Sequence, residues 1–116
     1  MTRFWTLYRL PSMDTPNIRI TSSLLKVLGA FIANKDELSG ADVAKLTGLS
    51  SGTLYPILMR LEQCKWLQSE WEDGDPHELG RPRRRLYRIT AVGARRARKE
   101  FSDFKTAIGR AAWTIS

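Results

Sequence analysis

The residues most able to do chemistry in this sequence are its arginines, which are concentrated in one segment. Residues 81–99, RPRRRLYRITAVGARRARK, contain eight arginines, one lysine and no acidic residue. These nine positive charges exceed the net charge of +7 of the whole chain of 116 residues. A concentrated cationic segment indicates binding to a polyanion, most often nucleic acid. The alternative is a solvated, solubilising face of the protein.

The composition limits other kinds of chemistry. A chain of 116 residues with 42% hydrophobic and 27% charged residues is typical of one small globular domain. One cysteine and one histidine provide neither an internal disulfide nor a zinc site, so we expect no metal, no cofactor and a reducing, cytoplasmic location. No apolar run approaches the roughly 18 residues that span a membrane. The acidic residues fall on predicted solvent faces or in loops, so we expect no enzyme activity.

Apolar spacing predicts three helices in the first half of the chain. The first covers residues 21–34 and has a broad apolar face. The second starts at the sequence SGAD, residues 39–42, which resembles a capping box, and Gly48 ends it. The third is capped by Ser50 and ends near Cys64. The short turn between the last two fits a helix-turn-helix, although any small helical bundle can contain one.

Two predicted strands and a turn follow the third helix. Residues 67–72, LQSEWE, alternate as a half-buried strand does, and a second strand covers residues 84–89. The glycine, proline and aspartate residues between them are typical of a turn, here about ten residues long. A hairpin directly after a helix-turn-helix is a wing. The residues expected to face inward are Leu67, Ser69, Trp71, Tyr87 and Ile89. The arginines expected at its tip are Arg81, Arg83 and Arg84.

The last helix is predicted from the cap at Thr90 to about Trp113. Its apolar residues repeat at spacings of four and three, which is the pattern of a coiled-coil seam. The seam consists of Ala97, Phe101, Phe104, Ile108, Ala111 and Ile115. A single winged domain is too small to cover so long a seam. We therefore expect residues 90–116 to form a dimerisation helix with Trp113 in its interface, the alternative being packing on the same subunit.

Three segments together resemble the PadR family of bacterial transcriptional regulators. They are SSGTLYPILMRLE at residues 50–62, LQSEWE at residues 67–72 and GRPRRRLYRITAVG at residues 80–93. The resemblance covers about residues 22–93, and its combined motifs are specific. It implies a mainly α fold with a small two-stranded β-wing, in which residues 21–89 form a winged helix-turn-helix. It also implies dimerisation through the C-terminal helix and repression by operator binding, as in the compact members with one such helix.

Three positions depart from the pattern of the family. Ser51 stands where the family usually has proline, which is a small change at a first helical position. Lys65 stands where the family usually has glycine, so a left-handed backbone there would cost about 1 kcal/mol. The insert DPHEL, residues 75–79, makes the wing longer and more acidic than usual, which leaves its DNA contact open.

The resemblance and the helix pattern together predict a double-stranded DNA interface. Because the leucines of the third helix face inward, the helix presents its N-terminus and its polar side chains to DNA. The predicted DNA-binding residues are Ser50, Ser51, Thr53, Tyr55, Arg60, Arg81, Arg83 and Arg84. A homodimer would bind a pseudo-palindromic operator with half-sites about one helical turn apart. When bound, the protein would be part of the bacterial nucleoid. Two alternatives stay open: a core role for Tyr55, and a basic face that binds an acidic protein partner.

Three further features leave alternatives open. Residues 1–20 form an N-terminal extension, which is either an arm that packs on a partner subunit or the product of a start site wrongly placed before Met13. The family resemblance allows a small-molecule effector at the dimer interface, where Phe104 and Trp113 would line its pocket; simple packing is the alternative. Cys64 is either a redox switch or a small buried hydrophobic residue.

Overall fold

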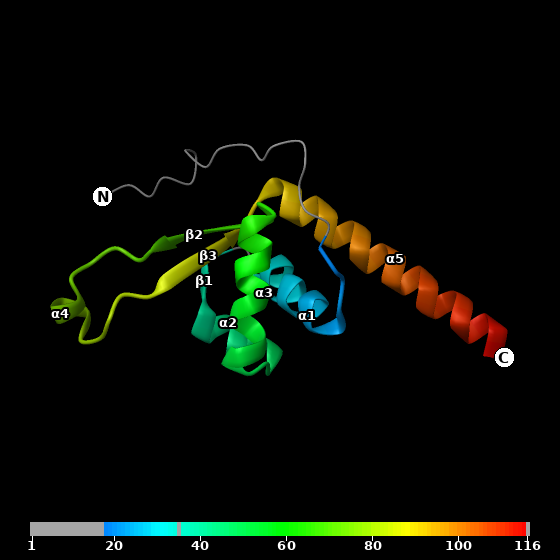
Figure 1. The fold of residues 1–116 in the computed structure, drawn as a ribbon, viewed down its shortest axis with the longest axis horizontal. Helices are drawn as coiled ribbons and strands as arrows, with labels where there is room; N and C mark the ends of the chain where they lie inside the picture. Colours follow the sequence, from blue (N-terminus) through cyan, green and yellow to red (C-terminus); the bar gives the residue numbers. More distant parts are fainter. Residues whose placement is uncertain (1–17, 35, 116) are drawn as a thin grey trace.

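The structure, a computed structural model, describes residues 18–34 and 36–115, with side chains to residue 113. The elements follow in the order α1 (Ser22–Ala33), β1 (Leu38–Ser39), α2 (Gly40–Thr47), α3 (Ser51–Gln63), β2 (Leu67–Trp71), α4 (Pro76–Leu79), β3 (Arg85–Ile89) and α5 (Ala91–Ile115). Helices α1, α2 and α3 form the centre, while the wing and α5 extend from it in opposite directions (Figure 1). The question of a start at Met13 lies outside the described residues. Ile18 and Ile20, predicted as part of the extension, pack against the core.

The sheet has three antiparallel strands in the order β1-β3-β2, one more than the predicted two-stranded wing. Strand β1 contributes only two residues, with Leu38 opposite Tyr87 and Ser39 opposite Leu86. A strand of two residues shows no alternation in the sequence, so it is not predicted. The sequence predicts Ser39 only as the cap of the second helix. Ser39 caps α2: its hydroxyl accepts from the N–H of Asp42 at 3.1 Å, and its own N–H donates to the Asp42 carboxylate at 3.0 Å. The predicted capping box is confirmed.

The wing is longer and more ordered than a simple turn. Its tip holds the four-residue helix α4, which Asp75 caps by accepting from the N–H of His77 at 3.0 Å. Gly80 ends α4 with a left-handed φ of 70°. The prediction that Trp71 faces inward is wrong, because its side chain is 57% exposed. The wing carries Trp71 beyond the helices that could cover it, and the guanidinium of Arg85 lies 5.4 Å from its ring centre.

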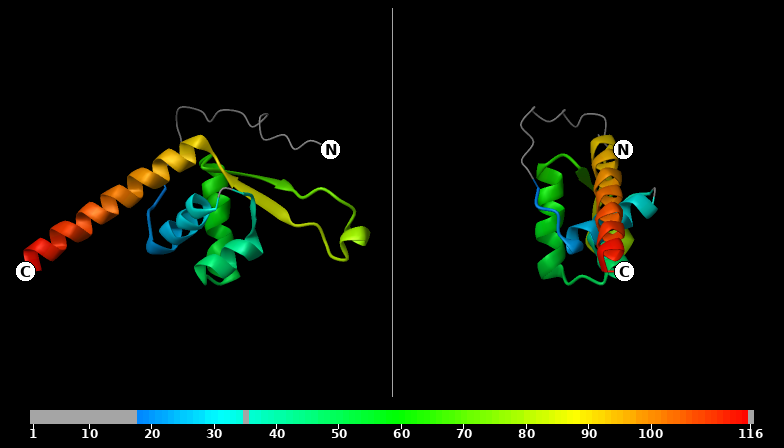
Figure 2. Two further views of the ribbon diagram at one scale, coloured as in Figure 1. Left: turned by 180° about the vertical axis from the view of Figure 1, so that it is seen from behind. Right: turned by 90° about the vertical axis from the view of Figure 1, so that its right-hand side faces the viewer.

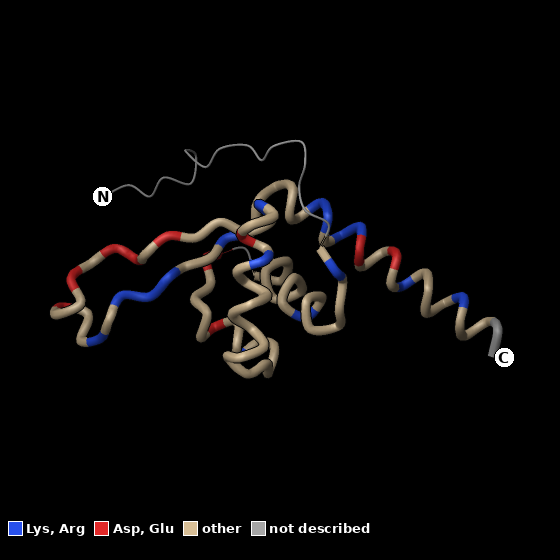
Figure 3. Tube along the Cα trace, viewed as in Figure 1, with Lys and Arg blue, Asp and Glu red and all other residues tan. Residues whose placement is uncertain are grey.

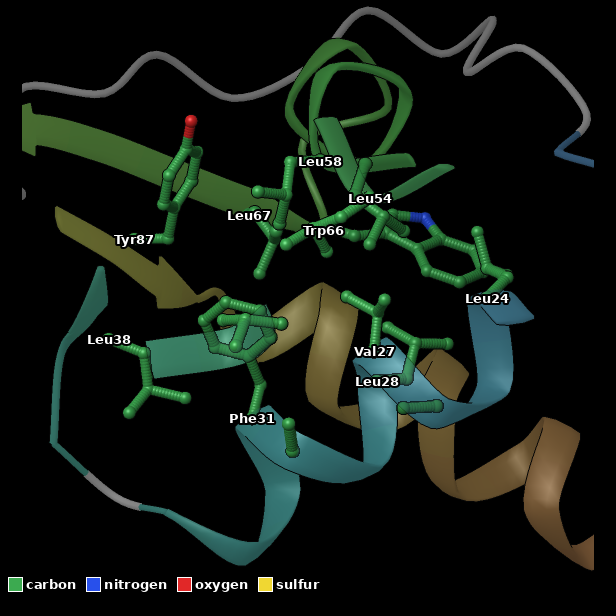
Figure 4. Packing of buried hydrophobic residues seen from close by; sticks show 14 of the residues in the cluster. Leu24, Val27, Leu28, Phe31, Leu38, Leu54, Leu58, Trp66, Leu67 and Tyr87 are labelled. Atoms are coloured by element: carbon green, nitrogen blue, oxygen red, sulfur yellow. The ribbon is translucent and has the colours of Figure 1, made fainter. Parts of the chain in front are cut away.

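The core lies where α1 and α3 pack together beneath the sheet (Figure 4). Leu54, Leu58 and Leu61 of α3 are buried, as their spacing predicts. They meet an apolar face of α1, which consists of Leu24, Val27, Leu28 and Phe31. Each such side chain contributes about 1.5–3 kcal/mol of hydrophobic stabilisation when fully buried. The core therefore fixes the orientation of α3, whose opposite face is left exposed.

The junction between α3, β2 and α5 explains several positions of the sequence motif. Thr90 caps α5 by accepting from the N–H of Gly93 at 3.0 Å, and its hydroxyl donates to the carbonyl of Lys65 at 2.7 Å. A Cβ atom on Gly93 would lie 2.2 Å from the carbonyl oxygen of Trp66, so only glycine fits there. Lys65 has a φ of 64°, the left-handed conformation that the usual glycine would adopt without strain.

Helix α5 packs on its own subunit only near its start, and the rest projects past the core (Figure 2). Ala97 has no exposed surface within the single chain, so its predicted place in a dimer interface is wrong. Phe101 is partly buried against the same core and lies near Gly29 of α1. One winged domain thus covers the first part of the predicted seam. The exposed residues that remain of the seam are Phe104, Ile108 and Ala111, and the side chain of Ile115 lies outside the described ones.

Candidate DNA interface

Helix α3 exposes a polar face that begins at its N-terminus. The predicted contact residues on it are all exposed: Ser50, Ser51, Thr53, Tyr55 and Arg60. Ser50 is the N-cap residue, but its hydroxyl donates to the Thr53 hydroxyl at 3.3 Å and makes no side-chain bond to a backbone N–H. Ser50 is thus the predicted N-cap residue, but its side chain makes no capping bond. Without it, the first N–H groups of α3 can receive an anion, which the helix dipole also attracts.

Tyr55 is 48% exposed, so it is not the core tyrosine of the alternative prediction. Its ring lies against the first residue of α2, because a Cβ atom on Gly40 would be 2.6 Å from the Tyr55 hydroxyl oxygen. The side chain therefore extends from α3 across the N-terminus of the preceding helix. This position places a hydroxyl group between the two helices and the base of the wing.

The wing arginines differ in their contacts with the rest of the protein. Arg81 forms a two-point ion pair with the carboxylate of Glu72, which also accepts from the backbone N–H of Arg84 at 2.9 Å. These bonds, led by the one from the Arg81 side chain, lower the pKa of Glu72 from 4.5 to about 2. The structure thus gives Arg81 a role in closing the wing, while Arg83 and Arg84 are exposed.

Charge on the wing is divided between its two limbs (Figure 3). Acidic residues follow the outgoing limb, and arginines follow the returning limb that leads into β3. The acidic residues are Glu70, Glu72, Asp73, Asp75 and Glu78. The remaining cations of the arginine-rich segment lie on the exposed part of early α5, across the molecule from the wing. One basic segment of sequence thus forms two separate basic surfaces, and only the wing surface lies beside α3.

A polar cluster that the sequence pattern does not predict joins α3 to the wing. The Ser69 hydroxyl donates to the carboxylate of Glu62 at 2.6 Å and accepts from Nε of Arg85 at 2.9 Å. The second guanidinium nitrogen of Arg85 lies 3.5 Å from the same carboxylate. In the sequence, the cluster is indicated only by Glu62 at the end of the motif RLE and by Ser69 and Arg85 on the two predicted strands. The cluster fixes the angle between α3 and the wing.

Potential metal ligands and thiol groups are few in the described part of the chain. No group of three potential ligands is present there. Cys64 is buried, and burial raises the pKa of its thiol, which disfavours the reactive thiolate. This fits the prediction of a small buried hydrophobic residue. No helix in the described ranges has the length and apolar character to cross a membrane.

The exposed part of α5 is the candidate dimer surface. Phe104 is 51% exposed and Ile108 is 54% exposed, four residues apart on one face. Trp113, near the end of the helix, is 85% exposed, but it lies nine residues beyond Phe104 and so about 180° around the helix from it. Large apolar side chains gathered on one face, as Phe104 and Ile108 are, mark an interaction surface more often than an isolated one does.

Comparison with known proteins agrees with this geometry. The model of the Transcriptional regulator PadR-like family matches residues 38–99, more than half of the chain. A PadR family transcriptional regulator from Eggerthella lenta is similar in structure, with a TM-score of 0.66, 23% identity and coverage of 78% of this chain and 80% of that one. The sequence matches no curated protein.

Two further solved structures share the fold at greater total length. MepR, a transcription regulator of the Staphylococcus aureus multidrug efflux pump MepA, gives a TM-score of 0.63 at 23% identity, covering 84% of this chain and 67% of its own. Bordetella bronchiseptica BpsR gives a TM-score of 0.62 at 22% identity, covering 80% and 61%. These likenesses establish the winged-helix arrangement of the chain.

Proposed function

Because the chain belongs to the PadR-like family of transcriptional regulators, we propose that it is a repressor that binds a pseudo-palindromic operator as a homodimer. Members of this family are DNA-binding regulators of transcription and not enzymes. The observation that carries the proposal is that Tyr55, on the exposed part of α3, lines the same pocket as Arg84 and Arg85 of the basic limb of the wing. The two elements together present hydroxyl groups, helix N–H groups and arginines to one polyanion.

The proposed contacts divide into two kinds. Ser51, Thr53 and Arg60 lie on the exposed face of α3 and would meet base edges or phosphates in the major groove. Arg83 and Arg84 on the wing would meet the flanking backbone or minor groove, where contacts add affinity for all sequences. Arg81, which is paired with Glu72, would hold the wing in shape for these contacts.

The homodimer is proposed from the projecting part of α5. Its face with Phe104 and Ile108 is apolar and exposed, and a second copy of the helix would cover it. Dimerisation through α5 would place two copies of α3 on the same side of a DNA duplex. A two-fold protein then requires a pseudo-palindromic site.

Selection of bound fragments from a random DNA pool would identify the operator and test the proposal. The selected sites should be inverted repeats with half-sites about one helical turn apart. The variant Arg83→Ala with Arg84→Ala should then weaken binding and reduce the salt slope by roughly one unit for each lost phosphate contact. The matched control removes two arginines from early α5, Arg95→Ala with Arg96→Ala. It should bind nearly as the parent does.

Two outcomes would favour the other candidate, a basic face that binds an acidic protein. One is the absence of any enriched sequence in the selection. The other is equal weakening of DNA binding by both arginine pairs, which would show general charge attraction without a defined DNA surface.

An effector at the dimer interface is proposed as a second property. The DNA binding of BpsR is regulated by 6-hydroxynicotinic acid. In this chain, Phe104 on the proposed interface and Trp113 farther along α5 are exposed aromatic side chains that would accept a small aromatic ligand. A panel of aromatic acids should contain one that changes operator affinity in the parent and has no effect on Trp113→Ala. If none does, these residues serve packing alone.

A further inference from the structure

A small pocket lies where α2, α3 and the wing meet. It has a volume of about 140 Å³, and its lining residues are Ser39, Gly40, Ala41, Tyr55, Arg84, Arg85 and Tyr87. They come from the start of α2, the exposed face of α3 and strand β3 with the residue before it. A water molecule takes about 30 Å³ of liquid, so the pocket has room for one tetrahedral oxyanion with some water.

Tyr87 is the first sign that the pocket is built for a ligand. Its side chain is only 8% exposed, but its hydroxyl is not fully buried: it reaches the pocket and makes no hydrogen bond to any residue that the structure describes. In Figure 4 the hydroxyl points away from Leu38 and Phe31, out of the apolar cluster. The hydroxyl is therefore open to the pocket and able to donate a hydrogen bond to a molecule that enters it.

The hydroxyl of Tyr87 can act only as a donor to an incoming anion. Burial raises its pKa, and the nearby charge of Glu62 raises it further, so it keeps its proton at neutral pH. Tyr55 adds a second hydroxyl, which also makes no hydrogen bond to a described residue. Two hydroxyl groups lining one pocket suit an acceptor with several oxygens.

The charges around the pocket favour an anion as well. Arg84 is exposed and lines it, while Arg85 is engaged with Glu62 and Ser69. Gly40 and Ala41 are the first two residues of α2, whose N–H groups have no partner within the helix. The Asp42 carboxylate opposes an anion, but it is turned to the backbone N–H of Ser39 at 3.0 Å.

From this arrangement we propose that the pocket binds a phosphate group, with Tyr87, Tyr55, Arg84 and the N-terminus of α2 as its donors. The proposal rests on the proposed DNA-binding function, because the group it assigns is one backbone phosphate of the bound duplex in each half-site. The pocket joins the first helix of the helix-turn-helix to the wing. A phosphate held there fixes both elements on the DNA at once.

The experiment removes the hydroxyl from the protein and the charge from the DNA. Duplexes of the selected operator carry one uncharged methylphosphonate at each position in turn, and affinity is measured by fluorescence anisotropy. Tyr87→Phe should weaken binding about fivefold, the effect of about one hydrogen bond, with an unchanged melting temperature. One methylphosphonate in each half-site should weaken the parent but leave Tyr87→Phe nearly unaffected. Gly40→Ala should behave likewise, since its Cβ atom would lie 2.6 Å from the Tyr55 hydroxyl oxygen and displace it.

Arg83→Ala is the matched control, because Arg83 belongs to the wing but does not line the pocket. This variant should bind DNA more weakly and still respond to the same methylphosphonate. If Tyr87→Phe binds as the parent does and responds to every methylphosphonate in the same way, the pocket does not hold a DNA phosphate. The proposed DNA-binding function would stand in that case.

A second measurement separates DNA from a free anion as the source of the phosphate. Inorganic phosphate is compared with chloride at equal ionic strength in thermal melts of the parent and of Tyr87→Phe. If the parent binds no DNA, the proposed function fails. A rise in melting temperature that Tyr87→Phe abolishes would then preserve the phosphate site and assign it to a free oxyanion. The absence of any such rise would overturn the site too.

Discussion

The carboxylate of Glu62, near the end of α3, lies 3.5 Å from the guanidinium of Arg85 on strand β3 of the wing. Ser69 on strand β2 bridges them, since its hydroxyl bonds both groups. Two charged side chains far apart in sequence thus join the exposed helix to the wing. Because the cluster is only partly buried, we expect it to contribute little to the free energy of unfolding. Its main effect should be to hold the angle between α3 and the wing.

This cluster predicts a coupling that can be measured. Glu62→Ala and Arg85→Ala should each lower the free energy of unfolding by about 1 kcal/mol, and the double variant should lose less than the sum. Urea denaturation checks stability and anisotropy checks DNA affinity. The matched control is the exposed pair Lys99–Asp103, 3.3 Å apart within α5. Its coupling should be about 0.3–0.5 kcal/mol at most, without an effect on DNA binding. Strict additivity for Glu62 and Arg85 would contradict the cluster.

Local signals in the sequence predicted most of the helices well. The apolar spacing of α3 predicted which leucines are buried, and the capping box at Ser39 and the glycine at position 48 predicted the ends of α2. These features depend on residues within a few positions of one another, so the sequence alone contains them. The strain at Lys65 was predicted because the resemblance showed where glycine is usual.

Features that depend on distant partners could not be predicted in the same way. The pairing of Leu38 and Ser39 with β3, and the exposure of Trp71, depend on how far the wing extends from the helices. Ala97 fits the heptad spacing of a dimer seam, but the same spacing also suits contact with α1. The basic segment is divided into two surfaces because β3 returns from the wing to the core and α5 then continues away from the core on the opposite side (Figure 1).

Glu72 predicts how the wing responds to pH. Its pKa is lowered from 4.5 to about 2 in the folded wing, chiefly by the bond from Arg81. The interaction therefore contributes its full stabilisation above about pH 4.5 and is lost as the pH falls through about 2. Carboxyl titration by NMR should give a pKa near 2 for Glu72 in the parent. In Arg81→Ala the value should rise toward 4.5, and amide exchange in residues 72–84 should become faster. An unchanged pKa in this variant would show that Arg81 is not its main partner.

Gly93 predicts a strong effect from a single methyl group. In Gly93→Ala the new Cβ atom would lie 2.2 Å from the Trp66 carbonyl oxygen, so the start of α5 must move away from the sheet. The loss in stability should be about 3 kcal/mol, the upper end for overpacking, because backbone cannot rotate aside. Gly109→Ala is the control in the same helix, where a Cβ atom meets nothing within 4 Å. It should stabilise the protein by about 0.5–1 kcal/mol. Similar melting temperatures for the two variants would contradict the close approach.

Lys65 predicts a substitution that stabilises the protein. Its φ of 64° is strained for a residue with a Cβ atom, and its carbonyl oxygen accepts a hydrogen bond from the Thr90 hydroxyl. Lys65→Gly should raise the free energy of unfolding by about 1 kcal/mol. Lys65→Ala separates the causes, because it removes the charge but keeps the Cβ atom, and it should give no such gain. Equal stabilisation by both variants would assign the effect to the charge.

The exposed face of α5 predicts the state of assembly. Phe104 and Ile108 stand on one face beyond the part of α5 that the core covers, so two copies of the chain should bury them against each other. Phe104→Glu with Ile108→Glu should give a monomer in sedimentation at tens of micromolar and weaken operator binding, while the winged domain stays folded. Phe101 is left unchanged because it packs against that domain.

The control for this substitution places the same two charges elsewhere on the helix. Ser102→Glu with Thr106→Glu changes exposed positions that lie about 200° around the helix from Phe104, at about 100° for each residue. This variant should remain dimeric. A monomeric parent protein, or dissociation by both variants alike, would contradict an interface on the Phe104 face, and the two half-sites of the operator would then have to be bound by independent monomers.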